Sequence, residues 1–152
     1  MSSFAFRLKN IYWNDINVKN RHTTLRHIQL LQLVWVGLGI GYNSYSFWLI
    51  NVGEPALSPT APLHGALFMI VCGSIIVWGY LGELSAYKLS LPILITLLLY
   101  SGLWLHLSVI AQNAEFTGYS STYSWAAAVL INSYGTVTLL TGLIIAWRTK
   151  TD

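Results

Sequence analysis

Residues 90–111 read SLPILITLLLYSGLWLHLSVIA, and this stretch decides the fold class. It contains no Lys, Arg, Asp or Glu, and it exceeds the roughly 20 residues that a helix needs to cross the hydrocarbon core of a bilayer. A spanning segment of this length is a helix, because a helix satisfies every backbone polar group within its own segment. The stretch therefore predicts a transmembrane helix.

Three further stretches share this property, at residues 28–50, 63–82 and 124–147. The segments between the four are short, so consecutive helices should pack antiparallel. Only 9% of the residues are charged and 55% are hydrophobic, which leaves too little polar surface for a water-soluble globule. We predict an all-α integral membrane protein whose residues 28–147 form an up-down antiparallel bundle of four transmembrane helices, with the lipid bilayer as a partner.

The basic residues predict the orientation of this bundle. All eight Lys and Arg fall in residues 1–27, at Lys88 or in the tail 148–152, and the other two connections contain none. The positive-inside rule then makes both termini cytoplasmic and the protein a multi-pass protein of the inner (cytoplasmic) membrane. Because the basic residues serve topology, we expect no nucleic-acid partner. The first 27 residues contain no compact signal-peptide pattern, so we expect the first span to be retained as an anchor.

Residues 1–27 form the basic N-terminal segment, for which two interpretations stay open. Phe4, Leu8, Ile11 and Tyr12 follow helical spacing, which favours an amphipathic helix on the cytoplasmic leaflet. The alternative is a flexible tail that only sets the topology.

Polar side chains at similar depth predict a site in the outer half of the bundle. His64 begins the second span on the outer side, and His106 lies near the outer end of the third. Asn43 and Asn132 fall in the outer halves of the first and fourth spans, and Gly102 lies one helical turn from His106. Since polar groups are costly to hold in lipid, they usually face the bundle interior. We expect these five residues to share one site.

Three kinds of chemistry fit this set. Neutral imidazoles on adjacent helices suit bis-histidine ligation of a b-type haem iron by His64 and His106, with the space beside glycines such as Gly102 admitting the flat ring. A quinone is the rival occupant, its carbonyls bonded by His, Asn and Tyr and its ring stacked on the aromatics Trp104, Tyr42 and Tyr134. In the third alternative no cofactor is bound, and His106 hydrogen-bonds to Asn43 or Asn132.

Small residues on the first span predict a helix contact. Gly37, Gly41 and Tyr45 follow i, i+4, i+8, a pattern that permits close approach of two helix backbones. The sequence contains no nucleophile-and-base set and no nucleotide-binding or metalloprotease signature, so whether the chain is an enzyme stays undecided.

Residues 58–81, SPTAPLHGALFMIVCGSIIVWGYL, resemble a helix of the haem-copper oxidase catalytic subunits and their small four-helix relatives. In that family the histidine at the outer end of this helix ligates low-spin haem, so the resemblance implies that His64 is an iron ligand. The family commonly has His-x-His near this point, whereas this chain has His64 alone. The third span shows no copper-ligand pattern, and oxygen reduction is not implied.

These observations support three functional hypotheses. The first is a small inner-membrane redox or accessory subunit that binds one b-type haem or a quinone in the outer half of the bundle and takes part in electron transport. The second is a non-enzymatic assembly or scaffolding subunit that binds other membrane subunits through the Gly37 and Gly41 strip. The third is a homo-oligomer through which small molecules or ions permeate.

Overall fold

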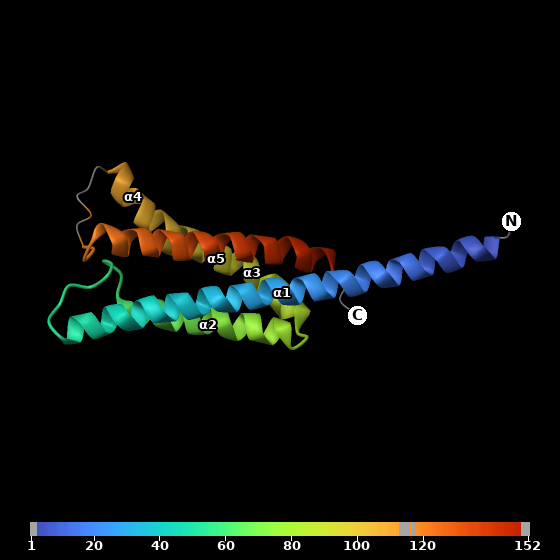
Figure 1. Cartoon of the computed structure of the whole chain (residues 1–152), viewed down its shortest axis with the longest axis horizontal. Helices are drawn as coiled ribbons and strands as arrows, with labels where there is room; N and C mark the ends of the chain where they lie inside the picture. The colour runs from blue at the N-terminus through green and yellow to red at the C-terminus, as the bar shows by residue number, and fades with distance from the viewer. Residues whose placement is uncertain (1–2, 113–115, 117, 150–152) are drawn as a thin grey trace.

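The computed structural model describes residues 3–112, 116 and 118–149, without the side chains of residues 3–19. All regular secondary structure in this part of the chain is helical. The π-helix η1 continues α3 and is continued by α4, so the described residues form four helical rods (Figure 1). The helices are α1 Ser3–Asn51, α2 Pro62–Tyr80, α3 Leu84–Leu97, η1 Leu98–Trp104, α4 Leu105–Ala111 and α5 Thr122–Arg148.

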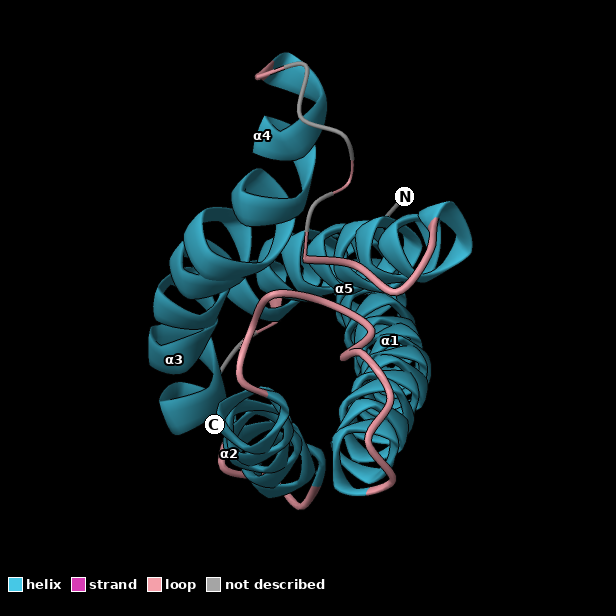
Figure 2. Ribbon diagram, turned by 90° about the vertical axis from the view of Figure 1, so that its left-hand side faces the viewer, coloured by secondary structure: helices cyan, strands magenta, loops and turns pink. Residues whose placement is uncertain are grey.

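The four rods form a ring in which each contacts two neighbours. α1 packs against α2 and α5, and α3 packs against α2 and α5 (Figure 2). Consecutive rods run in opposite directions, as the sequence predicts (Figure 1). The connection 52–61 and residues 118–121, which precede α5, lie at one end of the bundle, here called the loop end. The turn 81–83 and the C-terminal end of α5 lie at the opposite end, here called the basic end.

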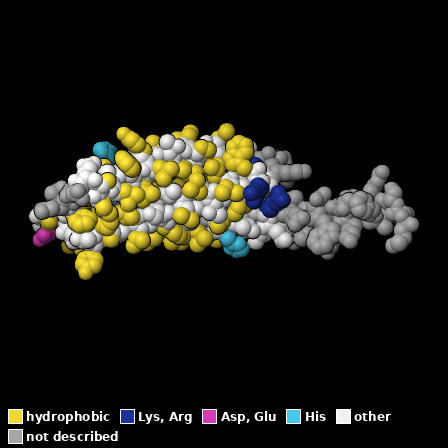
Figure 3. All heavy atoms as spheres, turned by 90° about the horizontal axis from the view of Figure 1, so that it is seen from above, with side chains coloured by type: hydrophobic (Ala, Val, Ile, Leu, Met, Phe, Trp, Pro, Cys, Tyr) yellow, Lys and Arg dark blue, Asp and Glu magenta, His cyan; other side chains and the backbone are white. Residues whose placement is uncertain are grey.

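Three rods are long and apolar enough to cross a membrane: α2, residues 84–111 and α5. In length and composition these helices are compatible with the predicted multi-span membrane protein. α1 is not among the three, and its apolar stretch 28–50 is interrupted by Gln29, Gln32 and Asn43. Hydrophobic side chains cover the sides of the bundle, and Lys and Arg gather near the basic end (Figure 3).

The helix ends differ from the hydropathy edges by more than two residues at two places. α1 begins at Ser3 and passes residue 28 without interruption, projecting beyond the bundle (Figure 1). The third rod begins at Leu84, six residues before the predicted edge at residue 90. Lipid contact requires apolar residues, whereas helical hydrogen bonding continues into water, so the two boundaries need not coincide. The predicted stripe of Phe4, Leu8, Ile11 and Tyr12 lies outside the described side chains.

The interior of the basic half is closely packed. Trp35, Tyr87, Leu91 and Leu139 are fully buried there, each from α1, α3 or α5. Gln32 joins these helices, because its amide donates to the Thr138 carbonyl at 2.9 Å and accepts from the Tyr87 hydroxyl at 2.8 Å. Polar side chains that bond to each other across helices are tolerated in an apolar interior. Around Gln32 and Trp35, the interior of this half is therefore closed.

Candidate functional site

The loop-end half encloses a cavity of about 320 Å³, here called the outer cavity. All five residues predicted to share a site line it, and they come from each of the four rods: Asn43, His64, Gly102, His106 and Asn132. Apolar walls come from side chains of α2, η1 and α5, namely Phe68, Met69, Leu98, Ala128 and Ile131. The predicted depths therefore correspond to a real juxtaposition in space.

His106 is held on both its ring and its backbone. Its imidazole is buried, and Nδ1 lies 2.5 Å from the Tyr119 hydroxyl. The Trp125 indole N–H donates to the His106 carbonyl at 2.8 Å. Burial raises the pKa of Tyr119, so this phenol is neutral at physiological pH and can donate or accept. The expected alternative, a bond from His106 to Asn43 or Asn132, is wrong, because Tyr119 occupies that role.

The His106 ring still has one nitrogen available. Nε2 has no hydrogen-bond partner among the described residues, and the ring lines the outer cavity. If Tyr119 donates to Nδ1, Nε2 carries the proton and is a donor; in the other tautomer Nε2 has a free lone pair. The tautomer therefore decides whether His106 bonds a carbonyl or ligates a metal.

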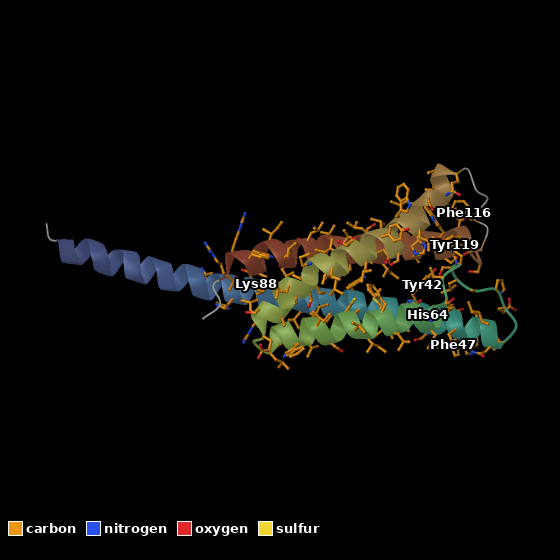
Figure 4. All side chains as sticks on the ribbon, turned by 180° about the vertical axis from the view of Figure 1, so that it is seen from behind. Tyr42, Phe47, His64, Lys88, Phe116 and Tyr119 are labelled. Carbon is orange, nitrogen blue, oxygen red and sulfur yellow. The ribbon has the colours of Figure 1, made fainter. Side chains whose placement is uncertain are left out.

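His64 lies at the mouth of the outer cavity, in the first turn of α2. Its side chain is exposed and makes no hydrogen bond with the described residues. The labelled side chains Tyr42, His64 and Tyr119 all lie toward the loop end (Figure 4). The two histidines thus line one cavity, one buried and one exposed.

Asn43 and Asn132 each donate one side-chain N–H to a carbonyl of their own helix. Asn43 Nδ2 donates to the Gly39 carbonyl at 2.8 Å, and Asn132 Nδ2 donates to the Ala128 carbonyl at 2.9 Å. Each side chain retains a second N–H and an amide oxygen with no partner among the described residues. These groups are available to a ligand.

The glycines facing these amides give them room. A Cβ on Gly65 would collide with the Asn43 side chain, and one on Gly102 would lie 2.8 Å from Asn132 Oδ1. The Asn132 amide occupies the place of a Gly102 side chain, whereas Gly102 itself lines the outer cavity, so the slot for a flat ring stays a prediction. Gly102 contributes to the site by admitting an amide.

The connection 52–61 at the loop end forms part of the wall of the outer cavity. The Tyr42 hydroxyl lies 3.1 Å from the Leu57 carbonyl and 3.0 Å from the Ser124 carbonyl, and Ser46 Oγ accepts from the Leu57 N–H at 3.0 Å. These contacts hold residues 57–61 over the cavity, where Ser58 and Thr60 line it. Hydropathy does not indicate that such loop residues belong to a site. The high Ser, Thr and Pro content of the connection is only a weak indication.

Of the three aromatic residues expected to stack on a ring, one lines the outer cavity and two do not. Tyr42 lines the outer cavity, whereas Trp104 is 62% exposed on the outer surface. Tyr134 donates to the Leu31 carbonyl at 3.2 Å and does not line the cavity. The prediction of stacking by Trp104 and Tyr134 is wrong, because rotation about the helix axis turns both away.

The π-helix η1 lies against the outer cavity and contributes Leu98, Ser101 and Gly102 to its wall. A π-turn contains more residues than an α-turn, so it shifts the angular position of every later side chain. His106 follows η1 directly on α4, and its direction depends on this shift. Spacing counted at 3.6 residues per turn does not anticipate such a change.

The Gly37 and Gly41 strip faces outward. A Cβ on either glycine would meet nothing within 4 Å, and both glycines, with Tyr45, are exposed. The strip is therefore no contact within this bundle. Its role as a contact with another chain stays a prediction.

The described residues contain no group of three or more His, Cys, Asp or Glu that would hold a metal ion. Of these four residue types, the described lining of the outer cavity contains His64 and His106. The resemblance of residues 58–81 to a haem-copper oxidase helix rests on the sequence alone. No protein-family model matches the chain, and neither the curated proteins nor the solved structures compared with it contain a match.

Proposed function

We propose that this protein is a small accessory subunit of a membrane electron-transfer system that binds a quinone-type ring in the outer cavity. The observation that supports this function is the convergence of polar groups from all four rods, with Tyr42 beside them, on one apolar-walled cavity. Ligand pockets typically combine a largely apolar lining with a few polar groups that fix orientation.

A single ring suits the outer cavity better than a haem does. Its volume of about 320 Å³ lies near the lower limit of the roughly 300 to 1,000 Å³ that ligand pockets occupy. The spaces beside Gly65 and Gly102, which a macrocycle would need, contain the Asn43 and Asn132 amides. The chemistry of the imidazoles at His64 and His106 fits iron, but the room around them favours the smaller ligand.

Two donors are suited to the ring carbonyls of a quinone. The second N–H of Asn132 is uncommitted, and His106 Nε2 donates whenever Tyr119 donates to Nδ1. Leu98, Met69 and Ile131 supply apolar contacts for the ring face. In this role the chain holds and orients the quinone, while electrons come from a partner subunit.

The proposed topology has four crossings, with α1 as the fourth, and both termini in the cytoplasm. α1 packs along α2 and α5 within the bundle, and its exposed side chains there include Leu30, Val34 and Leu38. The Lys and Arg with described side chains belong to segments at the basic end: Arg21 and Arg26 on α1, Lys88 in α3 and Arg148 at the end of α5. The positive-inside rule assigns that end to the cytoplasm of a bacterial inner membrane.

Cysteine labelling tests this topology in a Cys72→Ala background. Ser120→Cys at the loop end should react with an impermeant reagent on intact cells, and Ser85→Cys at the basic end only after permeabilisation. Ser120 is preferable to Ser121, whose side chain caps α5. The opposite labelling pattern would overturn the orientation.

Ligand binding is tested on detergent-purified protein by solvent extraction, haem assay and titration with a short-chain quinone. Wild-type protein should yield a quinone in the extract and should bind the added quinone. Asn132→Ala should weaken this binding about tenfold, which corresponds to roughly 1.4 kcal/mol of binding free energy. Asn51→Ala is the matched control, since Asn51 makes the same type of bond to its own helix outside the cavity.

The other outcomes identify the competing functions. Stoichiometric haem that is lost in both His64→Ala and His106→Ala would replace the quinone with a haem. Protein that contains neither ligand and copurifies with other chains would favour the scaffolding function.

A further inference from the structure

A second cavity of about 320 Å³ lies at the basic end, here called the inner cavity. It is formed between α1 and the tight turn that joins α2 to α3. Its lining is mainly polar and includes His22, Arg26, Gln29, Tyr80, Glu83 and Ser85. None of these residues belongs to the outer cavity.

The α1 wall of the inner cavity carries three hydrogen-bonding side chains on one helix face. His22, Arg26 and Gln29 follow the spacing i, i+4, i+7. Gln29 is 1% exposed, and its side-chain nitrogen has no hydrogen-bond partner among the described residues. An unpartnered buried amide costs about 1–3 kcal/mol. Its place in the wall of a polar cavity points to a ligand that accepts its hydrogen bond.

The opposite wall is the N-terminus of α3. The N–H groups of Ser85 and Ala86 have no acceptor among the described residues, and Glu83 supplies no side-chain cap. Three of the last four carbonyls of α2 are occupied, since those of Val77, Trp78 and Gly79 accept from the turn's own amides. The free amides and the dipole of α3 therefore attract negative charge to this wall.

Two fixed charges lie at the inner cavity. Arg26 lies over the Tyr80 ring, with 5.6 Å from Cζ to the ring centroid. Glu83 is exposed, and neither Arg26 nor Glu83 makes an ion pair with another described residue. One cation and one anion favour a ligand that carries both charges over a free dianion, which Glu83 would repel.

The inner cavity also lies at the border of the apolar surface. Leu81 and Trp78 are strongly exposed beside it, and Arg26 is exposed on α1. Exposed Trp next to cationic side chains is typical of the headgroup region of a bilayer. A ligand there is within reach of the membrane and of water.

We propose that the inner cavity binds the headgroup of a zwitterionic phospholipid with a primary ammonium, as in phosphatidylethanolamine. The phosphate diester accepts from Arg26, Gln29 and the first amides of α3, and the ammonium pairs with Glu83. This site is separate from the proposed quinone site, and either one can exist without the other.

Native mass spectrometry tests the proposal on protein that is delipidated and then supplied with phosphatidylethanolamine, phosphatidylglycerol or inorganic phosphate. Wild-type protein should retain one phosphatidylethanolamine in preference to the other two. Arg26→Gln should weaken retention by at least about tenfold, because a charged hydrogen bond is lost. Arg148→Gln is the matched control, since it removes the same charge at the same end, outside the inner cavity.

Gln29→Leu separates binding from folding. Without lipid it should preserve or raise the melting temperature, because it removes a buried unpaired amide, while it weakens retention of phosphatidylethanolamine. Equal retention by wild-type, Arg26→Gln and Gln29→Leu proteins would overturn the proposal. So would preferential binding of inorganic phosphate or of phosphatidylglycerol, which would assign the cavity to a different anion.

Discussion

The two halves of the bundle differ in how they treat the amides Gln32, Asn43 and Asn132, although the basic half also contains the buried, unpartnered nitrogens of Gln29 and Trp35. In the basic half, Gln32 bonds to Tyr87 and to the Thr138 carbonyl, and large side chains fill the surrounding space. In the loop-end half, Asn43 and Asn132 bond only to their own helices and face the outer cavity. Polar residues in a membrane bundle thus join helices where they find each other, and they can serve a ligand where they do not.

Glycines show the same contrast. Gly142 and Gly135 in the basic half make room for Gln32 and Trp35, which complete a closed core. Gly65 and Gly102 make room for amides that line the outer cavity. A substitution in the closed half should therefore cost folding free energy, whereas one in the open half should mainly change ligand binding.

The largest effect is expected for Gly142→Ala. Its Cβ would collide with the Gln32 amide and lie 2.6 Å from the Tyr87 hydroxyl, so both members of the network would be displaced. We expect a loss of about 3 kcal/mol in unfolding free energy, at the upper end for overpacking. Denaturant titration in detergent, followed by Trp fluorescence, measures it. An unchanged midpoint would mean that this half is not closed.

Tyr87→Phe should have the next largest effect. It removes the donor to Gln32 and leaves a buried amide oxygen unpaired, which costs about 1–2 kcal/mol. Tyr123→Phe is the control, since Tyr123 is 88% exposed and has no hydrogen bond with the described residues. The same denaturant titration should separate the two variants, and equal midpoints would exclude a structural role for the network.

Asn132→Ala should have a smaller effect on stability than Tyr87→Phe. It removes one bond within α5 and enlarges a cavity that already exists, so we expect a loss of about 0.6 kcal/mol. The loss in quinone-binding free energy should exceed the loss in unfolding free energy. A stability loss as large as that of Tyr87→Phe would contradict the contrast between the halves.

Gly37→Ala should have the smallest effect, because the added methyl group meets open space. We expect a change in unfolding free energy within about 0.5 kcal/mol. Size-exclusion chromatography of Gly41→Leu then examines contact with another chain. A smaller particle than the wild type would show that the strip joins subunits, and an unchanged one would assign it to lipid.

The candidate site was predictable in depth but not in direction. Counting residues from the span ends brought His64, His106, Asn43 and Asn132 to similar heights, and the structure has all four on one cavity. The same counting failed for Trp104, which faces outward. Depth depends on helical rise, which is constant, whereas direction depends on rotation and packing and here also on the π-helix η1.

Hydrogen-bond partners were harder to predict than positions. Tyr119 bonds to His106 from a loop that follows the third rod, and Tyr42 reaches the loop residue Leu57. Loop conformations depend on turn geometry and on the positions of the helices that the loops join. The periodicity of apolar residues predicts neither of these. The inner cavity was likewise invisible, since it depends on the α2–α3 turn approaching α1.

The sequence by itself predicted a helical membrane protein with its basic residues at one end, because long segments without charge satisfy their backbone in lipid as helices and charged residues stay at their ends. Tertiary structure alone decided which polar groups meet a partner and which face a cavity. The physical reason is that solvation acts on each segment separately, whereas helix rotation, glycine contacts and loop closure arise only when the four rods pack together.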